Sequence, residues 1–486
     1  MLQTLKNAWR TPDIRRKLLY VAFILIIYRI GTVIPVPFVD ASNFEANFGN
    51  TIFAYMDVLS GNALSQATLF ALGISPYITA SIIIQLLAVA FPALGEKMKD
   101  SKDLNEKLTR YITVVLAVIT GYGYYALLKS YGMLSLPAGG KGIEVLAGIV
   151  IVACYCAGAS VVMWLGEKIN ENGIGNGISI ILFANIVSSI PSILIKLGQL
   201  IRTSFAGDIR IGAFSYSALR PAEGADKFWA IALAIGFALG VILVTLALTM
   251  FVIYITGSER RIPILYAKRV VGRKMYGGQN THLPIKLNMT GVMPIIFASS
   301  IMSLLPTILT LCGVVQRDSY ADCQTFWERA QLFFSADRWF YPVCLFVLII
   351  AFAYFYVSIS FNTTEVANNL KKNGGMIPGI RQGRPTSVFI DNVTRKVTLV
   401  GALFLGVIAI LPIIMAPLVI RPIVTAILTR ASGYSAEALT EGRVVSSFSQ
   451  AFAFGGTSLL IVIGVAQETF REIEAQLTMR NYKGFL

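Results

Sequence analysis

The sequence predicts an all-α polytopic membrane protein with ten transmembrane helices in two inverted five-helix halves. Three observations lead to this prediction. The composition is strongly apolar, ten apolar stretches are each long enough to cross a bilayer, and two short motifs of the first half recur in the same order in the second. Since each half contains an odd number of spans, the second half enters the membrane from the opposite side, as in inverted-repeat proteins.

The composition is that of a membrane protein. Hydrophobic residues make up 55% of the 486 residues, charged residues only 14%, and the mean hydropathy is +0.68. A soluble domain carries about 25% charged residues. The net charge of +15 could indicate nucleic-acid binding, but in a polytopic chain we interpret it as a signal of orientation. The N-terminal apolar run is long enough to span and lacks a small-residue cleavage site, so we expect no cleavable signal peptide.

The five cysteines follow no zinc-ligand spacing. Cys154, Cys156 and Cys344 lie in apolar spans, and we interpret them as packing residues. Cys312 and Cys323 fall in one extramembrane loop, where pairing and separate thiols both remain open. The sequence contains no Walker loop, so we expect no cofactor, no metal site and no enzymatic activity of the chain itself.

The predicted spans cover about twenty residues each, which is the length needed to cross the hydrocarbon core. They lie at roughly 18–37, 74–92, 109–130, 144–165, 176–198, 228–256, 289–311, 341–361, 397–418 and 448–468. Before the first span, residues 1–17 mix basic and apolar residues in a pattern typical of a short amphipathic helix on an anionic inner leaflet.

Lysine and arginine set the orientation. With the N-terminus inside, and span ends counted with their adjoining loops, the inside segments hold 27 of the 41 basic residues against 12 outside, and Arg29 and Lys196 fall within spans. We therefore expect both termini in the cytoplasm. The first half then comprises residues 1–200 and the second half residues 201–486.

The second span changes character in its middle. Residues 61–72 are small and half polar, whereas residues from Ile74 to Phe91 are almost all apolar. Gly73 and Pro76 at the junction favour a break in the helix, and non-helical backbone at this depth is tolerated only inside protein or along a water-filled cavity. We therefore predict a re-entrant segment at the mouth of a pathway, followed by a helix that lines it.

Two internal matches relate the halves. The segment Gly73-Ile74-Ser75-Pro76-Tyr77-Ile78 resembles Gly291-Val292-Met293-Pro294-Ile295-Ile296, and Gly177-Ile178-Ser179-Ile180-Ile181-Leu182 resembles Gly456-Thr457-Ser458-Leu459-Leu460-Ile461. Interrupted membrane segments at corresponding places in two halves indicate a site at the interface between them.

Two inside loops are longer than a connection requires. Residues 257–288 carry seven basic residues and one acid, and residues 362–396 carry six basic residues and two acids. Both contain glycine and proline turn signals. Positive-inside charge alone accounts for many of these residues, but the length favours projecting loops that bind a polyanion such as ribosomal RNA or an acidic protein face.

At these motifs the chain resembles the SecY family, the channel subunit of the bacterial Sec translocon. The resemblance covers nearly the whole chain and is most specific in WLGEKINENGIGNGISI at 164–180, in the loop and helix at 258–300, in NNLKKNGGMIPGIR at 368–381 and in residues 454–486. It implies two inverted halves around an hourglass pore. It also implies a channel for unfolded, signal-bearing polypeptides that releases transmembrane segments sideways into lipid of the bacterial cytoplasmic membrane.

The resemblance also implies site residues, carried over by motif. The pore ring would be Ile74, Ile78, Ile178, Leu182, Ile296 and Ile461. The plug would be residues 61–72, with Gly61, Asn62, Ala63, Leu64, Ser65 and Ala67 as its small or apolar members. The lateral gate candidates are Thr79, Gln85, Asn288 and Thr290, beside the second, third, seventh and eighth spans.

The implied partners are the small subunits SecE and SecG, the motor SecA, and the ribosome. The residues expected to bind SecA or the ribosome are Arg260, Arg261, Lys268, Arg269, Arg273, Lys274 and Arg381. The chain departs from the family pattern in residues 95–111, which end in Thr-Arg-Tyr but lack the usual preceding basic run. The outside loop 312–340 shows no pattern that can be carried over.

Two other functions were weighed against a channel. Secondary transporters usually place ionisable residues mid-membrane, whereas the middles of these spans hold no Asp or Glu, and Arg29 is the one clear basic exception. We interpret Arg29 as a structural donor to backbone carbonyls at the constriction. An intramembrane protease would need a nucleophile and a base, but the only histidine is His282, in a basic loop.

Overall fold

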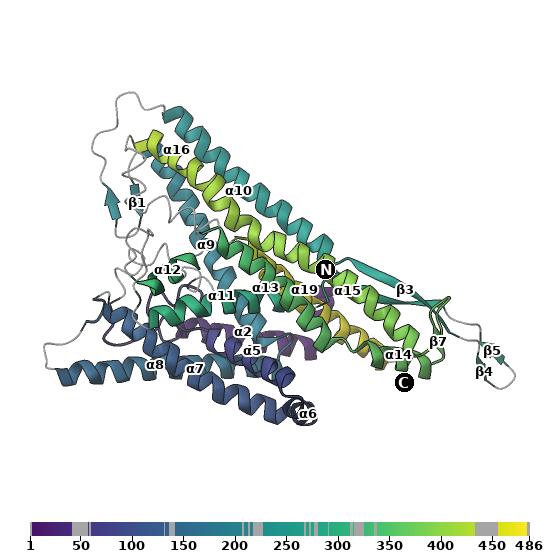
Figure 1. Ribbon diagram of the computed structural model, residues 1–486. Helices are drawn as coiled ribbons and strands as arrows, with labels where there is room; N and C mark the ends of the chain where they lie inside the picture. The colour runs from purple at the N-terminus through teal and green to yellow at the C-terminus, as the bar shows by residue number, and fades with distance from the viewer. Residues whose placement is uncertain are drawn as a thin grey trace.

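The computed structural model describes residues 2–40, 57, 60–130, 132–135, 141–206, 209–211, 214–216, 227–266, 269–271, 274–276, 280–289, 291–311, 314, 325–334, 338–432 and 455–483. Long helices dominate the described part of the chain (Figure 1). Two groups of helices diverge toward the left of Figure 1: α7 and α8 belong to one, and α10, α15 and α16 to the other.

The first half of the chain is helical wherever it is regular. Its helices are α1 (Leu2–Arg10), α2 (Pro12–Gly31), α5 (Ser75–Ala90), α6 (Pro92–Asp100), α7 (Lys102–Ser130), α8 (Lys141–Asn172) and α9 (Gly177–Ala206). Proline occupies the first turn of α2, α5 and α6, where its missing N–H costs no hydrogen bond.

The second half adds short strands to its helices. Its elements are β1 (Ile209–Ile211), β2 (Phe214–Tyr216), α10 (Lys227–Thr256), β3 (Glu259–Tyr266), β4 (Arg269–Val271), β5 (Lys274–Tyr276), β6 (Asn280–Lys286), α11 (Met293–Leu311), α12 (Phe326–Phe333), α13 (Phe340–Ser360), α14 (Thr363–Lys372), β7 (Gly375–Met376), α15 (Arg384–Met415), the π-helical segment η2 (Ala416–Ile420), α16 (Arg421–Ser432) and α19 (Gly455–Lys483).

Each predicted span overlaps one long helix. The ten helices are, in order, α2, α5, α7, α8, α9, α10, α11, α13, α15 and α19. Within the described residues, six helices are long and apolar enough to cross a membrane by length and hydropathy, or seven if α5 and α6, bent by 119° at Phe91, are one broken span. The break predicted before Pro76 is present, because residues 61–74 form turns that lead into α5, whereas the bend at Phe91 was not predicted.

Three helix boundaries differ from the sequence prediction. α9 continues through residue 200 to Ala206, so the proposed division between the halves lies within a helix. The ninth helix runs past Pro412 and Pro417 because η2 widens the turn there and the chain continues as α16. At the N-terminus, the predicted amphipathic segment is interrupted at Thr11, which separates α1 from α2.

One large hydrophobic core joins both halves. Its buried members come from α2, α5, α7, α8, α9, α10, α11, α13, α15 and α19, and from turns outside the helices, among them residues 64 and 70–72 before α5. A second cluster links the end of α9, the start of α10 and α16 through Leu200, Ala234 and Val424. This packing is the physical reason that α9 and the ninth helix continue beyond their predicted ends.

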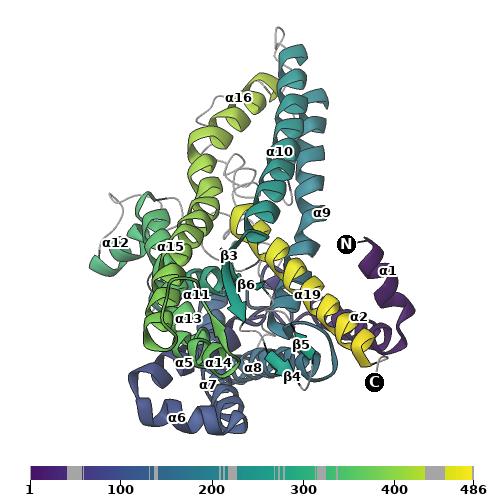
Figure 2. The ribbon, with the colours of Figure 1, turned by 90° about the vertical axis from the view of Figure 1, so that its right-hand side faces the viewer.

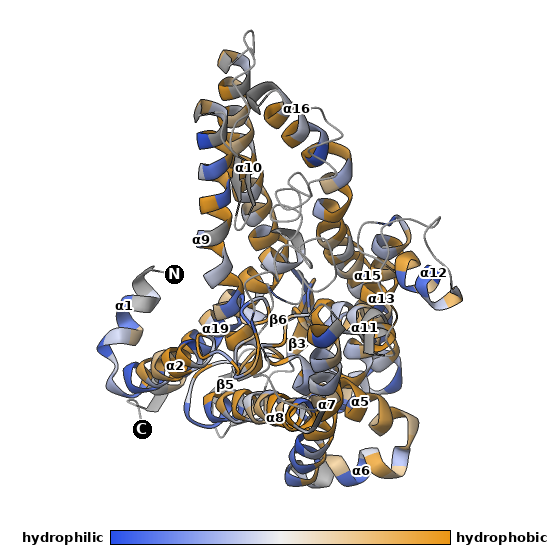
Figure 3. Cartoon of the chain, turned by 90° about the vertical axis from the view of Figure 1, so that its left-hand side faces the viewer, coloured by the Kyte–Doolittle hydropathy of each residue, from blue (hydrophilic) through white to orange (hydrophobic). Residues whose placement is uncertain are grey.

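The segments predicted on one side of the membrane lie together. Both ends of the chain, α6, α14 and strands β3 to β7 lie toward the right of Figure 1, whereas β1, α12 and α16 lie toward the left. Figure 2 shows α1 beside the end of α19, where Thr4 Oγ1 of α1 donates to Glu474 Oε1 at 3.5 Å and Lys17 Nζ of α2 donates to Gln476 Oε1 at 3.3 Å. Hydrophobic residues cover the long helices in Figure 3, and hydrophilic residues gather on α1 and at helix ends.

Candidate functional site

Residues 60–74, here called the turn segment, form a chain of turns before α5. The segment lies against residues 34–36: Val36 N donates to Ala67 O at 3.1 Å, and Leu69 N donates to Ile34 O at 2.9 Å. Tyr124 Oη of α7 donates to Leu64 O at 2.6 Å. Because its carbonyls and amides bond to α7 and to the chain after α2, the segment is held inside the bundle without a helix of its own.

Small residues let the turn segment approach its neighbours closely. Ala63 and Ala67 are fully buried, and Phe70 stacks on Tyr28 of α2 with ring centroids 5.6 Å apart. A Cβ added at Gly158 of α8 would lie 1.9 Å from Leu69 O. The predicted plug residues 61–72 therefore occupy an interior position against α2, α7 and α8.

The six predicted ring residues belong to one buried cluster. Ile74, Ile78, Leu182, Ile296 and Ile461 are each at most 5% exposed, and Ile178 packs against the same cluster. They come from the beginnings of four helices: Ile74 and Ile78 lie at the start of α5, Ile178 and Leu182 on α9, Ile296 on α11 and Ile461 on α19.

The backbone brings the beginnings of these helices close together. A Cβ added at Gly166 of α8 would lie 3.8 Å from Ile74 Cδ1 and 4.0 Å from Ile178 N. At Gly177 it would lie 2.0 Å from Gly166 O, and at Gly464 of α19 it would lie 2.2 Å from Val292 Cγ1. Glycines at these positions therefore permit the close packing of α9 on α8 and of α19 on the chain entering α11.

Arg29 contacts two backbone carbonyls. Its Nη2 donates to Ala184 O of α9 at 2.8 Å, and its Nη1 to Gly61 O at 3.5 Å. The expectation that Arg29 is a structural donor to carbonyls is confirmed. An arginine in a membrane span is costly unless its donors find acceptors, and these carbonyls supply them.

Of the predicted gate residues, Gln85 lies where the first half meets the second. The Gln85 side chain of α5 lies beside Tyr356 of α13, and its Nε2 donates to Ser81 Oγ at 3.2 Å. Thr79 is half-buried, Asn288 is buried just before α11, and Thr290 lies outside the described residues. Phe297 of α11 packs on Tyr356, with ring centroids 5.2 Å apart, so an aromatic pair of the second half that the sequence did not single out lies beside this contact.

The two basic loops form one structure. β3 pairs with β6 along its length and with β7 at its end, where Leu265 lies opposite Met376 and Tyr266 opposite Gly375. Ile262, Ile264 and Ile285 of the sheet pack with residues of α14 and α15. The alternating pattern of Ile262 and Ile264 in the sequence could have indicated a strand, but its pairing with a loop a hundred residues later could not be read locally.

The predicted partner-binding residues lie on this projection where the structure describes them. Arg260 and Arg261 are exposed on β3, and Arg381 is exposed after β7. Arg269 and Lys274 lie on the paired strands β4 and β5. Lys268 and Arg273 lie outside the described residues. At the base of the sheet, partial burial lowers the pKa of Lys286 from its ordinary value, and the nearby Arg471 guanidinium lowers it further.

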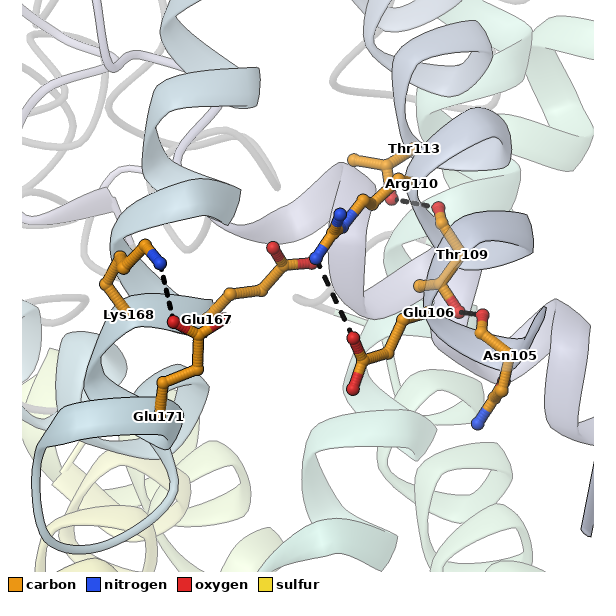
Figure 4. A network of polar contacts seen from close by, with 8 residues as sticks. All are labelled: Asn105, Glu106, Thr109, Arg110, Thr113, Glu167, Lys168 and Glu171. Carbon is orange, nitrogen blue, oxygen red and sulfur yellow. Dashed lines mark hydrogen bonds and ion pairs between the residues drawn. The ribbon is translucent and has the colours of Figure 1, made fainter. Parts of the chain in front are cut away.

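A polar network that sequence reasoning missed ties α7 to α8 (Figure 4). Arg110 Nε donates to Glu167 Oε1 at 2.9 Å, and Arg110 also lies 3.7 Å from Glu106. Thr109 and Thr113 each donate to the carbonyl one turn earlier, as Figure 4 shows. The sequence signal that could have indicated this ion pair is the presence of opposite charges, Arg110 and Glu167, at the neighbouring ends of the third and fourth predicted spans. Thr109 and Arg110 of the divergent segment 95–111 thus bond within the molecule, whereas Tyr111 is exposed.

The cysteines of the spans are unpaired, as expected: Cys154, Cys156 and Cys344 are free and half-buried. Cys312 and Cys323 lie outside the described residues. Among the described residues, no group of three or more His, Cys, Asp or Glu could hold a metal ion.

Comparisons with solved structures show the fold. The structure of a protein-conducting channel matches this one with a TM-score of 0.56 at 15% identity, and the match covers 95% of this chain and 92% of that chain. A SecY structure described for the role of its plug domain in the closed state gives a TM-score of 0.53 at 16% identity, and Sec61 from a canine ribosome-channel complex gives 0.53 at 15%. Each match covers 95% of this chain and 92% of the other chain.

Sequence comparisons are closer. The SecY family model matches residues 68–470. The protein translocase subunit SecY of Streptomyces galbus is 39% identical, and that of Mycobacterium tuberculosis 37%, each over the full length of both chains. With a buried turn segment, two matched halves and whole-length identity of this order, the chain belongs to the SecY family.

Proposed function

We propose that the chain is the protein-conducting channel of a bacterial Sec translocon, with the six aliphatic residues as its seal and residues 61–72 as its plug. The observation that carries the assignment is that Ile74, Ile78, Ile178, Leu182, Ile296 and Ile461 all lie near helix beginnings of both halves and all belong to, or pack against, the same hydrophobic core. A narrow apolar constriction excludes water and hydrated ions. Its contacts are non-directional, so unfolded polypeptides of any sequence can pass.

The contact between α5, α11 and α13 is the proposed lateral gate. Across it, Gln85 of the first half lies beside Tyr356 of the second half, on which Phe297 packs. Parting this contact would open a path from the centre of the bundle to lipid, which is the route a transmembrane segment needs for lateral release.

The projection built from β3, β6 and β7 is the proposed binding site for SecA and the ribosome. Arg260, Arg261 and Arg381 are exposed on it, and basic side chains favour a polyanionic partner. The ribosome-channel complex of canine Sec61 supports the ribosome as a partner by likeness of fold. SecE and SecG are proposed as small subunits from family membership. The projection and both termini would then face the cytoplasm.

Planar-bilayer recording tests the seal. Ile78→Asn with Ile296→Asn places polar groups in the constriction, and we expect ion current where the parent channel passes little. Deletion of residues 61–72 should also conduct. Ile84→Asn is the control, because Ile84 is on the same helix, is 2% exposed and lies outside the central cluster.

The double variant should also export substrates with weaker signal sequences, since a destabilised closed state needs less differential binding to open. Inserted variants that neither conduct nor relax substrate choice would show that the six residues are ordinary helix core.

A further inference from the structure

Arg29 connects the turn segment to the helix on its other side. The residue lies in the last turn of α2 and is half-buried. Its two terminal nitrogens point to different partners: Nη2 to Ala184 O of α9 and Nη1 to Gly61 O of the turn segment. One side chain therefore joins α2, α9 and the turn segment.

The surroundings of Gly61 are shaped for this contact. Gly61 has a φ of +71°, which favours glycine. A Cβ added there would lie 2.9 Å from Asn185 Oδ1 and 3.1 Å from Arg29 Nη1. Asn185 is in turn fixed by donating from Nδ2 to Tyr28 Oη at 2.9 Å. Only a residue without a side chain lets the turn segment reach the guanidinium and the amide together.

We propose that Arg29 is the positioning residue of the plug. Its guanidinium holds the Gly61 carbonyl beside α9 in the closed channel and releases it on opening. The inference rests on the proposed role of residues 61–72. A guanidinium presents donors in a rigid plane and can serve two acceptors at once, whereas a lysine ammonium is a compact point charge. The carbonyl at Gly61 is the movable partner, because Ala184 lies within α9.

The release is reversible because water can replace the lost acceptor. In the closed state Arg29 needs protein carbonyls, since a charged side chain in a membrane span is otherwise costly. When the turn segment leaves, the space it vacates joins the aqueous pathway, and water can bond to the freed Nη1. The contact thus favours the closed state without making opening prohibitive.

Thiol labelling of the plug tests the proposal. Ala63, which is fully buried, is changed to Cys in a full-length channel without the five native cysteines, and an impermeant thiol reagent is added from outside. We expect slow labelling in the parent and labelling about tenfold faster in Arg29→Gln, which corresponds to about 1.4 kcal/mol in the closing equilibrium. Arg29→Lys should give an intermediate rate.

Gly61→Ala tests the contact from the other side without removing the charge, and it should also accelerate labelling. Its matched control is Gly132→Ala: Gly132 has a similar φ of +67° but no atom within 4 Å of an added Cβ. If Arg29→Gln and Gly61→Ala both insert and are both labelled at the parent rate, the proposal is overturned. A parent rate in Arg29→Lys would also overturn it, because a positive charge alone, without the two-acceptor geometry of a guanidinium, would then be enough to hold the turn segment.

The result is separable from that of the proposed function. If deletion of 61–72 causes no ion current, the segment is not a seal, yet labelling still reports whether Arg29 holds it. If the deletion conducts and labelling ignores Arg29, the plug role stands and the Arg29 proposal falls.

Discussion

Gly73 and Gly291 adopt the same left-handed backbone conformation at equivalent positions of the two halves. Their φ angles are +54° and +64°. Each lies two residues before the first residue of a helix, Ser75 of α5 or Met293 of α11, and each helix has proline as its second residue. The internal match between these segments therefore marks the same turn leading into a helix in each half.

Alanine at either glycine should destabilise the protein by a similar amount. A left-handed conformation costs an L-residue about 1–2 kcal/mol, and an added Cβ meets nothing closer than 3.6 Å at Gly73 and nothing within 4 Å at Gly291. Gly73→Ala and Gly291→Ala should each lower the melting temperature in detergent. Gly236→Ala, in an open position on α10, should leave it unchanged or raised. A cost at only one of the two glycines would contradict their equivalence.

The topology can be tested with single cysteines in a channel without native cysteines. Thr281 on β6 and Lys372 at the end of α14 are exposed on the projecting side, and Arg329 on α12 is exposed at the opposite end. We expect Cys at 281 and 372 to resist an impermeant reagent added outside intact cells, and Cys at 329 to react. Ready labelling at either of the first two sites would reverse the orientation.

Arg381→Glu should reduce secretion of a reporter while the protein inserts and accumulates normally. Arg381 is exposed, and the structure gives its backbone a bond from Thr386 Oγ1 at 2.8 Å that the substitution leaves intact. Surface substitutions usually change stability by about 0.5 kcal/mol or less. Lys372→Glu removes the same charge from the same loop. Equal losses of secretion in both variants would indicate loop charge in general, and loss of the Arg381→Glu protein itself would indicate a structural role.

The ion pair between Arg110 and Glu167 should stabilise the contact of α7 with α8. Its side chains are 43% and 14% exposed, so solvent screening limits its contribution, and we expect a coupling of about 0.5–1 kcal/mol in a double-mutant cycle with Gln at each position. The control pair Arg395 and Asp391 is 70% and 39% exposed on one helix and should couple more weakly. Equal coupling in the two pairs would contradict the distinction.

The helices were predictable because each span is a continuous apolar run of sufficient length. The ends were not. The continuation of the ninth helix through Pro417 depends on a π-helical turn and on packing against α9 and α10, which no local rule reveals. For the candidate site, glycine and proline breaks indicated which residues meet at the centre, since such breaks are visible in sequence.

What sequence could not supply were the partners of polar groups across long separations. Arg110 meets Glu167, Arg29 meets Gly61 and Ala184, and β3 meets β7. Each pair combines residues that are common at helix ends or in loops, and only the fold determines which of many possible partners is within reach.

The sheet that joins the two basic loops has a mechanical consequence. β3 follows α10, β6 precedes α11, and β7 lies between α13 and α15. A load applied to this sheet is therefore shared by four helices of the second half and by none of the long helices of the first. A motor that pushes on the sheet would rotate the second half relative to the first. The contact that would open is the one where α5 meets α11 and α13.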